Sequence, residues 1–182
     1  MVNMNFKHIL LGFFALLLFV SVEAQEKKSV QATATKRTWK LNVGDEAPNF
    51  TFKDMNGKEV SIKDFRGKYL YIDVWTTTCG SCIRQFPYLK KLEEEMKGKN
   101  IAFISVSLEK DMDVWKKMVK ERKLEGSQLN VGDAKDFRST YEISGMPFII
   151  LLDKEGKILR IRSIILPSSP HTLKLLQGLE GI

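Results

Sequence analysis

The hydrophobic pattern of the chain alternates between short apolar runs and longer stretches with helical spacing. The runs predict buried strands, the clearest at residues 68–75, 101–108 and 148–152 and shorter ones at 128–131 and 157–162. Apolar residues spaced three or four apart predict helices at residues 81–97 and 112–124, and a short helix is expected at 134–141. Ser169 and Pro170 suit an N-cap and a first helical position, so a last helix is predicted at 170–179. The strand, helix, strand order from 68 to 108 implies parallel strands joined by a right-handed crossover. We therefore predict an α/β fold with a central mixed β-sheet flanked by helices.

A further pair of strands is predicted ahead of the first of these helices. Residues 49–53 and 59–62 flank the sequence Asp54-Met55-Asn56-Gly57, in which the glycine supplies the positive φ that a tight turn requires. This arrangement predicts an extra N-terminal β-hairpin.

The first 24 residues have the pattern of a secretory signal peptide. A basic start at Lys7 and His8 precedes an apolar run of about 12 residues, and Ala24 ends a small-residue cleavage site. The run is shorter than the ~20 residues that span a bilayer, although an uncleaved anchor is conceivable. We expect a signal peptide at 1–24, a flexible Lys-, Thr- and Ala-rich tether at 25–42 and one folded domain at 43–182. The protein is therefore expected to be periplasmic or otherwise exported.

The chain is basic, with a formal net charge of +7 at pH 7. Such a charge favours acidic partners or a membrane surface, but it is also what a solvated face of mixed lysines and carboxylates carries. Basic and aromatic residues do not alternate in the way that nucleic-acid binding requires, so no nucleic-acid partner is expected.

The chemistry-bearing motif is Cys79-Gly80-Ser81-Cys82, which holds both cysteines of the chain and directly follows a predicted buried strand. Two intervening residues let the sulfurs close a small ring. A helix that starts at Cys79 points its amide N–H groups at that sulfur, and such sites lower a thiol pKa from about 8.5 to roughly 3.5–7.5. The motif therefore indicates redox chemistry of a thiol pair.

Three other readings compete with redox chemistry. A purely structural disulfide across so short a loop contributes only about 2 kcal/mol by the chain-entropy estimate. A structural zinc site requires four ligands, usually cysteines and histidines, and besides its two cysteines the chain has only the histidines His8 and His171. A copper site built from both cysteines and His171 is chemically allowed. Copper-carrying proteins with a similar cysteine motif space their cysteines one residue further apart.

Three features together resemble the thioredoxin fold. They are the order of helices and strands, the Cys-x-x-Cys at the end of a strand, and Met146-Pro147 just before a late apolar strand. The sequence is most similar to the secreted TlpA/ResA-like branch of that superfamily, which is related to the AhpC/TSA peroxiredoxins. The stretches 44–50, 57–62 and 65–68 resemble the N-terminal hairpin that this branch shares with peroxiredoxins. The resemblance covers roughly residues 43–179.

The resemblance implies roles for particular residues. Cys79 corresponds to the exposed nucleophile and Cys82 to the buried sulfur that resolves the mixed disulfide. Asp73 corresponds to a buried carboxylate six positions before the nucleophile, and burial would raise its pKa and let it accept the Cys82 proton. Trp75 corresponds to the tryptophan four positions before the nucleophile, and we place it with the substrate-binding residues.

Pro147 matches the family's cis-proline, which lies against the two sulfurs and leaves the backbone of the preceding residue free to pair with substrate. Met146 is then expected to line the substrate groove, although an ordinary role in core packing is equally compatible with it. The sequence departs from the family at Thr78, which stands where an aromatic is usual, and at Ser81, which replaces the common proline. The loss of that proline removes a rigid φ, so a reduction potential cannot be carried over from the family.

These residues predict an exported thiol–disulfide oxidoreductase that reduces or exchanges disulfides in extracytoplasmic proteins through Cys79 and Cys82. The thiol cycle needs no bound cofactor, and a monomer is expected. The resemblance implies a membrane thiol-electron donor of the CcdA/DsbD type and a role in cytochrome c maturation. One alternative is a peroxiredoxin-like peroxidase, in which Thr76 fits the pattern but Ile72 occupies its proline position. Another is a copper or haem chaperone that uses the fold as a binding module.

Overall fold

The computed structural model describes residues 39–182, so the predicted signal peptide and all but the last four residues of the predicted tether lie outside its described part. Its strands are β1 (Thr51–Asp54), β2 (Glu59–Ser61), β3 (Tyr69–Trp75), β4 (Ile101–Ser107), β5 (Ser127–Asn130), β6 (Phe148–Leu152) and β7 (Ile158–Ile161). Its helices are η1 (Ile62–Phe65), α2 (Gly80–Glu95), α3 (Met112–Glu121), α4 (Lys135–Thr140) and α5 (Pro170–Gln177). Within residues 39–182, none of these helices is long and apolar enough to cross a membrane.

All seven strands belong to one sheet, in the order β2-β1-β5-β4-β3-β6-β7. Strand β4 runs parallel to β3 and to β5, whereas every other pairing is antiparallel. The parallel step from β3 to β4 contains α2, as the strand, helix, strand order predicted. The predicted α/β fold with a mixed sheet is therefore confirmed, and the predicted N-terminal hairpin is the pair β1 and β2.

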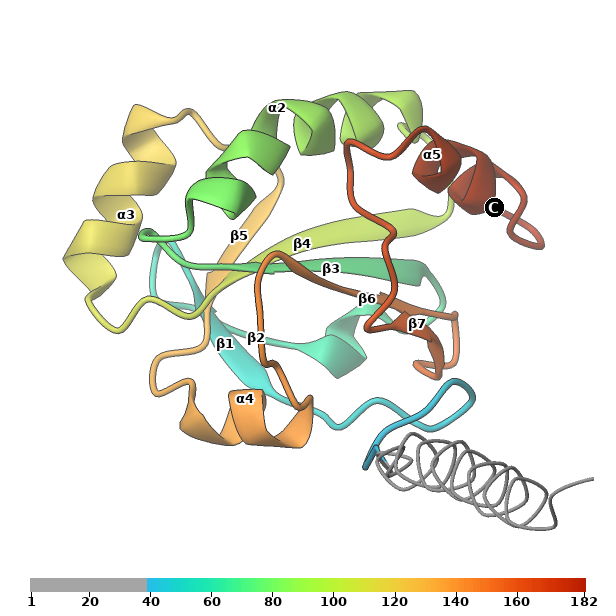
Figure 1. Cartoon of the computed structure of the whole chain (residues 1–182), viewed down its shortest axis with the longest axis horizontal. Helices are drawn as coiled ribbons and strands as arrows, with labels where there is room; N and C mark the ends of the chain where they lie inside the picture. Colours follow the sequence, from blue (N-terminus) through green and yellow to red (C-terminus); the bar gives the residue numbers. More distant parts are fainter. Residues whose placement is uncertain (1–38) are drawn as a thin grey trace, which may run out of the picture. The chain divides into compact units, whose positions relative to one another are not determined.

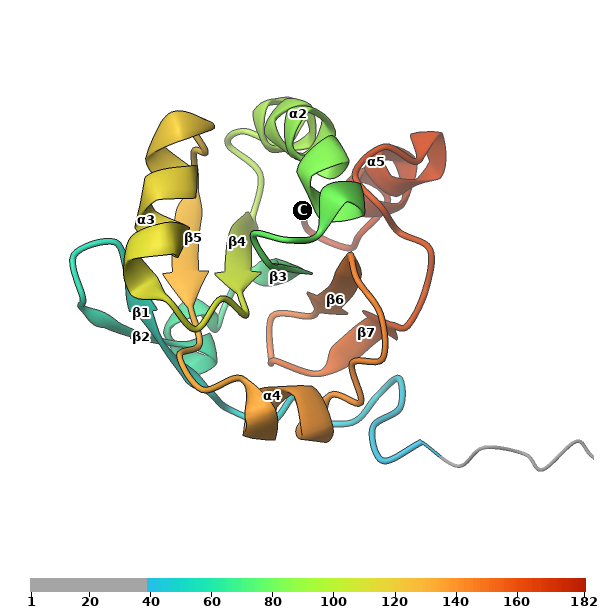
Figure 2. The same ribbon diagram turned by 60° about the vertical axis from the view of Figure 1, so that its left-hand side comes forward.

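Helices cover both faces of the sheet (Figures 1 and 2). On one face, α2 and α5 enclose a core that includes Tyr71, while α2 and α3 enclose a second core around Trp75. On the opposite face, α4 and η1 pack on the largest core, which contains Ile72. Side chains of a strand alternate between faces, so Asp73 shares the α2 face with its neighbours Tyr71 and Trp75. Strand β3 is buried along its whole length, as the apolar residues on both sides of Asp73 predicted.

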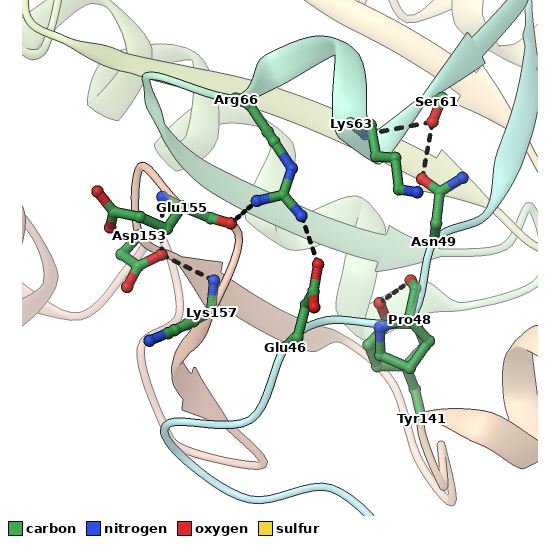
Figure 3. Close-up of polar contacts among 10 residues, drawn as sticks. All are labelled: Glu46, Pro48, Asn49, Ser61, Lys63, Arg66, Tyr141, Asp153, Glu155 and Lys157. Carbon is green, nitrogen blue, oxygen red and sulfur yellow. Dashed lines mark hydrogen bonds and ion pairs between the residues drawn. The ribbon is translucent and has the colours of Figure 1, made fainter.

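Polar contacts join the segments that flank the N-terminal hairpin to the rest of the fold (Figure 3). The guanidinium of Arg66 donates to the Glu155 carbonyl oxygen and pairs with the Glu46 carboxylate. The buried Tyr141 hydroxyl donates to the Pro48 carbonyl oxygen at 2.8 Å. These contacts tie the segment before β1 to α4 and to the turn between β6 and β7.

The short helix η1 was not predicted from the hydrophobic pattern. Ser61 caps it through the Lys63 N–H, while the Asp64 carboxylate accepts the Ser61 N–H in return. This reciprocal pair is a capping box, which satisfies backbone N–H groups that a helix start leaves without partners.

Candidate active site

Cys79 occupies the N-cap of α2, where β3 has ended and the chain turns into the helix. The turn is closed by the Cys79 N–H, which donates to the Thr76 carbonyl oxygen at 3.0 Å. The Cys79 Sγ accepts the Cys82 N–H at 3.2 Å, as a capping side chain does. An anionic sulfur here is stabilised by this N–H and by the positive end of the helix dipole.

Cys79 and Cys82 are joined in a disulfide. The two sulfurs differ in accessibility, because Cys79 is half-buried whereas Cys82 is only 1% exposed. Cys82 lies in the core formed with Trp75, Phe86 and Trp115. An incoming group can therefore reach Cys79 more readily than Cys82.

The loop before β6 lies beside this disulfide. The Met146–Pro147 peptide bond is cis, and Met146 is half-buried against the core that holds Cys82. The Ser81 hydroxyl lies 3.3 Å from the Met146 carbonyl oxygen and 3.3 Å from the Cys79 Sγ. Ser81 thus connects the cysteine motif to the proline loop, a contact that the sequence did not reveal.

Asp73 is a buried carboxyl group on the α2 face of β3. Its side chain is 1% exposed, and neither carboxylate oxygen has a hydrogen-bond partner within residues 39–182. Burial raises the pKa of Asp73 from 3.8 to about 7, and the nearby Glu93 carboxylate adds to the increase. A group with such a pKa exchanges its proton near neutral pH, as a general base for a thiol must.

The structure does not place Trp75 at the surface. Its side chain is 0% exposed and packs edge-to-face on Phe86, with ring centroids 5.1 Å apart. A direct contact between Trp75 and a substrate is therefore not available in this conformation, and the expectation of such a contact is corrected. The indole instead supports the helix that carries both cysteines.

Polar groups that the sequence did not single out lie where β3, β4 and β5 end. The Thr77 hydroxyl donates to the Glu109 carboxylate, and the Asn130 side chain donates to the Glu109 carbonyl oxygen at 2.8 Å. These residues lie at the C-terminal ends of three adjacent strands of the sheet. They therefore lie together on the side of the sheet from which the chain turns towards Cys79.

The structure does not assemble the copper site considered from the sequence, and His8 of the zinc alternative lies outside the described residues. His171 is exposed on α5, and no group of three or more His, Cys, Asp or Glu side chains in the described part could hold a metal ion. The copper site built from Cys79, Cys82 and His171 is therefore not formed.

The fold and the cysteine pair together define a thiol–disulfide oxidoreductase with a thioredoxin-like fold. Comparison with known proteins identifies the family, because the protein-family model described as Redoxin matches residues 42–171. The chain belongs to the Redoxin family. This agrees with the resemblance drawn from the motifs.

Individual relatives support the same class. Thiol-disulfide oxidoreductase ResA from Bacillus thuringiensis subsp. konkukian (strain 97-27) is 31% identical over 121 residues, which are 66% of this chain and 69% of the relative. The thioredoxin domain of a thiol-disulfide oxidoreductase from Bacteroides vulgatus has a TM-score of 0.69 at 33% identity, covering 75% of this chain and 96% of that one. A thiol-disulfide oxidoreductase from Bacteroides fragilis NCTC 9343 has a TM-score of 0.64 at 29% identity, covering 74% of this chain and all 100% of that one. The chain is thus a thiol–disulfide oxidoreductase of the ResA type.

Proposed function

We propose that the protein is exported and works as a reductant of disulfides in extracytoplasmic proteins. The observation that carries the proposal is the unequal exposure of the two sulfurs, with the half-buried Cys79 at the start of α2 and Cys82 behind it. An accessible nucleophile backed by a shielded sulfur suits a reaction in which a protein substrate binds first and is then released. Export is inferred from the signal-peptide pattern of residues 1–24.

The proposed cycle starts with both cysteines reduced. The Cys79 thiolate attacks one sulfur of a substrate disulfide, which forms a mixed disulfide and releases the other substrate sulfur as a thiolate. Asp73 then takes the proton of the Cys82 thiol, and the Cys82 thiolate attacks the Cys79 Sγ. The second substrate sulfur leaves as a thiolate that is protonated from water, and the Cys79–Cys82 disulfide remains. Two electrons have passed from the protein to the substrate.

The loop of Met146 and Pro147 is the proposed substrate contact. The half-buried Met146 borders the same core as Cys79, so an extended chain that reaches Cys79 passes close to this loop. The carbonyl oxygen of Met146 is able to accept a backbone N–H from such a chain once the Ser81 hydroxyl releases it. A backbone contact of this kind tolerates many substrate sequences.

A continuing cycle requires a source of electrons that reduces the Cys79–Cys82 disulfide again. We propose a membrane thiol-electron donor of the CcdA/DsbD type, with apocytochrome c before haem attachment as the first substrate to test. The protein needs no bound cofactor in this scheme because the two sulfurs carry the electrons. We propose that it acts as a monomer.

The proposal is tested by trapping substrates in cells. A Cys82→Ser variant retains the nucleophile but lacks the resolving sulfur, so mixed disulfides with substrate proteins should accumulate. They should be absent from a matched Cys79→Ser variant and should disappear on reduction. Mature protein and trapped adducts should be found outside the cytoplasm, with c-type apocytochromes among the partners. An equal set of adducts from both variants would overturn the assigned roles, and adducts with cytoplasmic proteins alone would overturn export.

A further inference from the structure

Three buried polar side chains lie in one row across the sheet on the α2 face. Asp73 of β3 is in register with Ser105 of β4, and Ser105 is in register with Gln128 of β5. Both pairings are parallel, so the three side chains point to the same side of the sheet and neighbouring strands are about 4.8 Å apart. All three residues are less than 9% exposed. The surface of the sheet beneath α2 is therefore interrupted by polar groups on three neighbouring strands.

Members of this row have polar atoms without protein partners. Both carboxylate oxygens of Asp73 and the Oε1 of Gln128 lack hydrogen-bond partners within the described residues. Buried groups of this kind are normally satisfied, and water supplies the bond where protein does not. The row therefore has the properties of a hydrated path.

The far end of the row meets a pocket of about 420 Å³ between α2 and the segment after α3. The pocket is lined by residues that include Ser105, Gln128, Glu93 and Phe86. Its rim carries the exposed Lys123 and Glu125, so the pocket opens to solvent. One water takes about 30 Å³ of liquid volume, so the pocket has room for several.

The opposite approach to Asp73 is occupied by closely packed side chains. Cys82, Trp75 and Trp115 are 1%, 0% and 0% exposed and pack together on the disulfide side of the α2 face. The pocket is therefore the more open approach to the row.

We propose that protons move between Asp73 and solvent along the row Asp73, Ser105, Gln128 and through the pocket, with Glu93 as the terminal relay group. This inference rests on the proposed role of Asp73 as the proton acceptor of Cys82. Glu93 is a relay residue and touches neither the substrate nor the reacting sulfurs.

The charged groups around Glu93 suit this role. Lys90 lies on the same helix, and Arg122, Lys123 and Glu125 face the pocket from the segment that follows α3. Partial burial and the Glu125 carboxylate raise the pKa of Glu93 to about 7, while Lys90 opposes the increase. The pKa values of Asp73 and Glu93 are thus both raised towards neutrality, so each group is able to take up and release a proton near neutral pH.

The path carries one proton in each cycle. After Cys82 has given its proton to Asp73, the neutral Asp73 carboxyl loses the proton to water in the row, and the Glu93 carboxylate accepts it through the pocket. Glu93 then releases it to solvent. Asp73 is again ionised, and no electron moves along the path.

The test measures the resolving step with an aromatic disulfide, 5,5′-dithiobis(2-nitrobenzoate), as the substrate. The reduced protein releases one thiolate when Cys79 attacks and a second when Cys82 resolves, so stopped-flow absorbance separates the two steps. A pH-indicator dye in weakly buffered solution reports the proton that leaves Cys82, which in the unaltered protein should reach solvent together with the second release. We expect Glu93→Gln and Ser105→Val to delay this proton by about tenfold or more. Both thiolate releases should keep their rates at high pH, where Asp73 is already ionised when Cys82 resolves. A control on the same helix, Glu95→Gln, removes an exposed carboxylate outside the pocket and should match the unaltered protein.

The pH profile distinguishes a path from an electrostatic effect. Glu93→Gln removes a like charge near Asp73 and should move the inflection of the second release to lower pH. Ser105→Val changes no charge, so it should delay the proton and leave the inflection in place. The proposal is overturned if the proton still reaches solvent together with the second release in Ser105→Val, or if Glu93→Gln only moves the inflection. If Asp73→Asn itself leaves the second release unchanged, the proposed role of Asp73 fails instead. Thermal unfolding of each variant confirms that it is folded.

Discussion

The Ser81 hydroxyl donates a hydrogen bond to the Met146 carbonyl oxygen at 3.3 Å across 65 positions of sequence. The same hydroxyl lies 3.3 Å from the Cys79 Sγ, so one proton has two possible acceptors. A disulfide sulfur is a weak acceptor, whereas a thiolate is charged and binds a donor about twice as strongly as a neutral group does. Reduction of the disulfide should therefore draw the Ser81 proton to Cys79 and release the Met146 carbonyl for a substrate.

Replacing Ser81 by alanine should make the disulfide harder to reduce. The variant loses a donor to the reduced Cys79 thiolate, and the difference between a charged and a neutral hydrogen bond is about 1 kcal/mol. This corresponds to a reduction potential about 20 mV more negative. Equilibration with glutathione or dithiothreitol buffers measures the change.

A Ser81→Thr variant is the matched control because it retains the hydroxyl. Its reduction potential should remain close to that of the unaltered protein. A potential that is equal in Ser81→Ala and the unaltered protein would contradict the assigned hydrogen bond to the thiolate.

Replacing Asp73 by asparagine should stabilise the folded protein at neutral and alkaline pH. The folded-state pKa of Asp73 is about 7, above the ordinary 3.8, so the folded state binds a proton that the unfolded chain has already lost. The proton on Asp73 therefore adds to the free energy of unfolding. This contribution is fully present below about pH 4 and is lost as the pH rises to about 7. Asparagine cannot ionise, so the variant should gain on the order of 4 kcal/mol at pH 8 and little at pH 4.

Urea unfolding at several pH values measures this effect. Glu93 also has a raised pKa, so the variant should retain part of the fall in stability with pH. A gain in stability that is equal at pH 4 and pH 8 would show that the effect does not come from ionisation of Asp73.

Replacing Tyr141 by phenylalanine should destabilise the fold without affecting the chemistry. The ring is fully buried against Phe137, and only the hydroxyl bond to the Pro48 carbonyl oxygen is lost. The free energy of unfolding should fall by about 1 kcal/mol, while the rate of disulfide exchange stays the same. Urea unfolding and stopped-flow exchange measure the two quantities, and a slower exchange with unchanged stability would contradict this assignment.

The main elements were predictable because their signals are local. The mostly apolar run of β3 and the three- and four-residue spacing in α2 each identify an element without knowledge of its neighbours. The missed helix η1 also had a local signal, since Ser61 and Asp64 have the spacing of a capping box.

The parts of the site that were missed depend on contacts between distant residues. Ser105 and Gln128 look like ordinary polar residues in the sequence, and only the register of β3, β4 and β5 aligns them with Asp73. The burial of Trp75 likewise depends on Phe86 and on α3, which the local sequence around the tryptophan does not contain. Register and helix packing are settled by tertiary contacts, so a single sequence does not show them.

The most direct test of the proposed function is the equilibrium reduction potential of the Cys79–Cys82 pair in glutathione or dithiothreitol buffers. A reductant of extracytoplasmic disulfides should have a value near that of thioredoxin, about −270 mV. A value near −120 mV would instead describe an oxidant of secreted thiols and would contradict the proposed direction of electron flow.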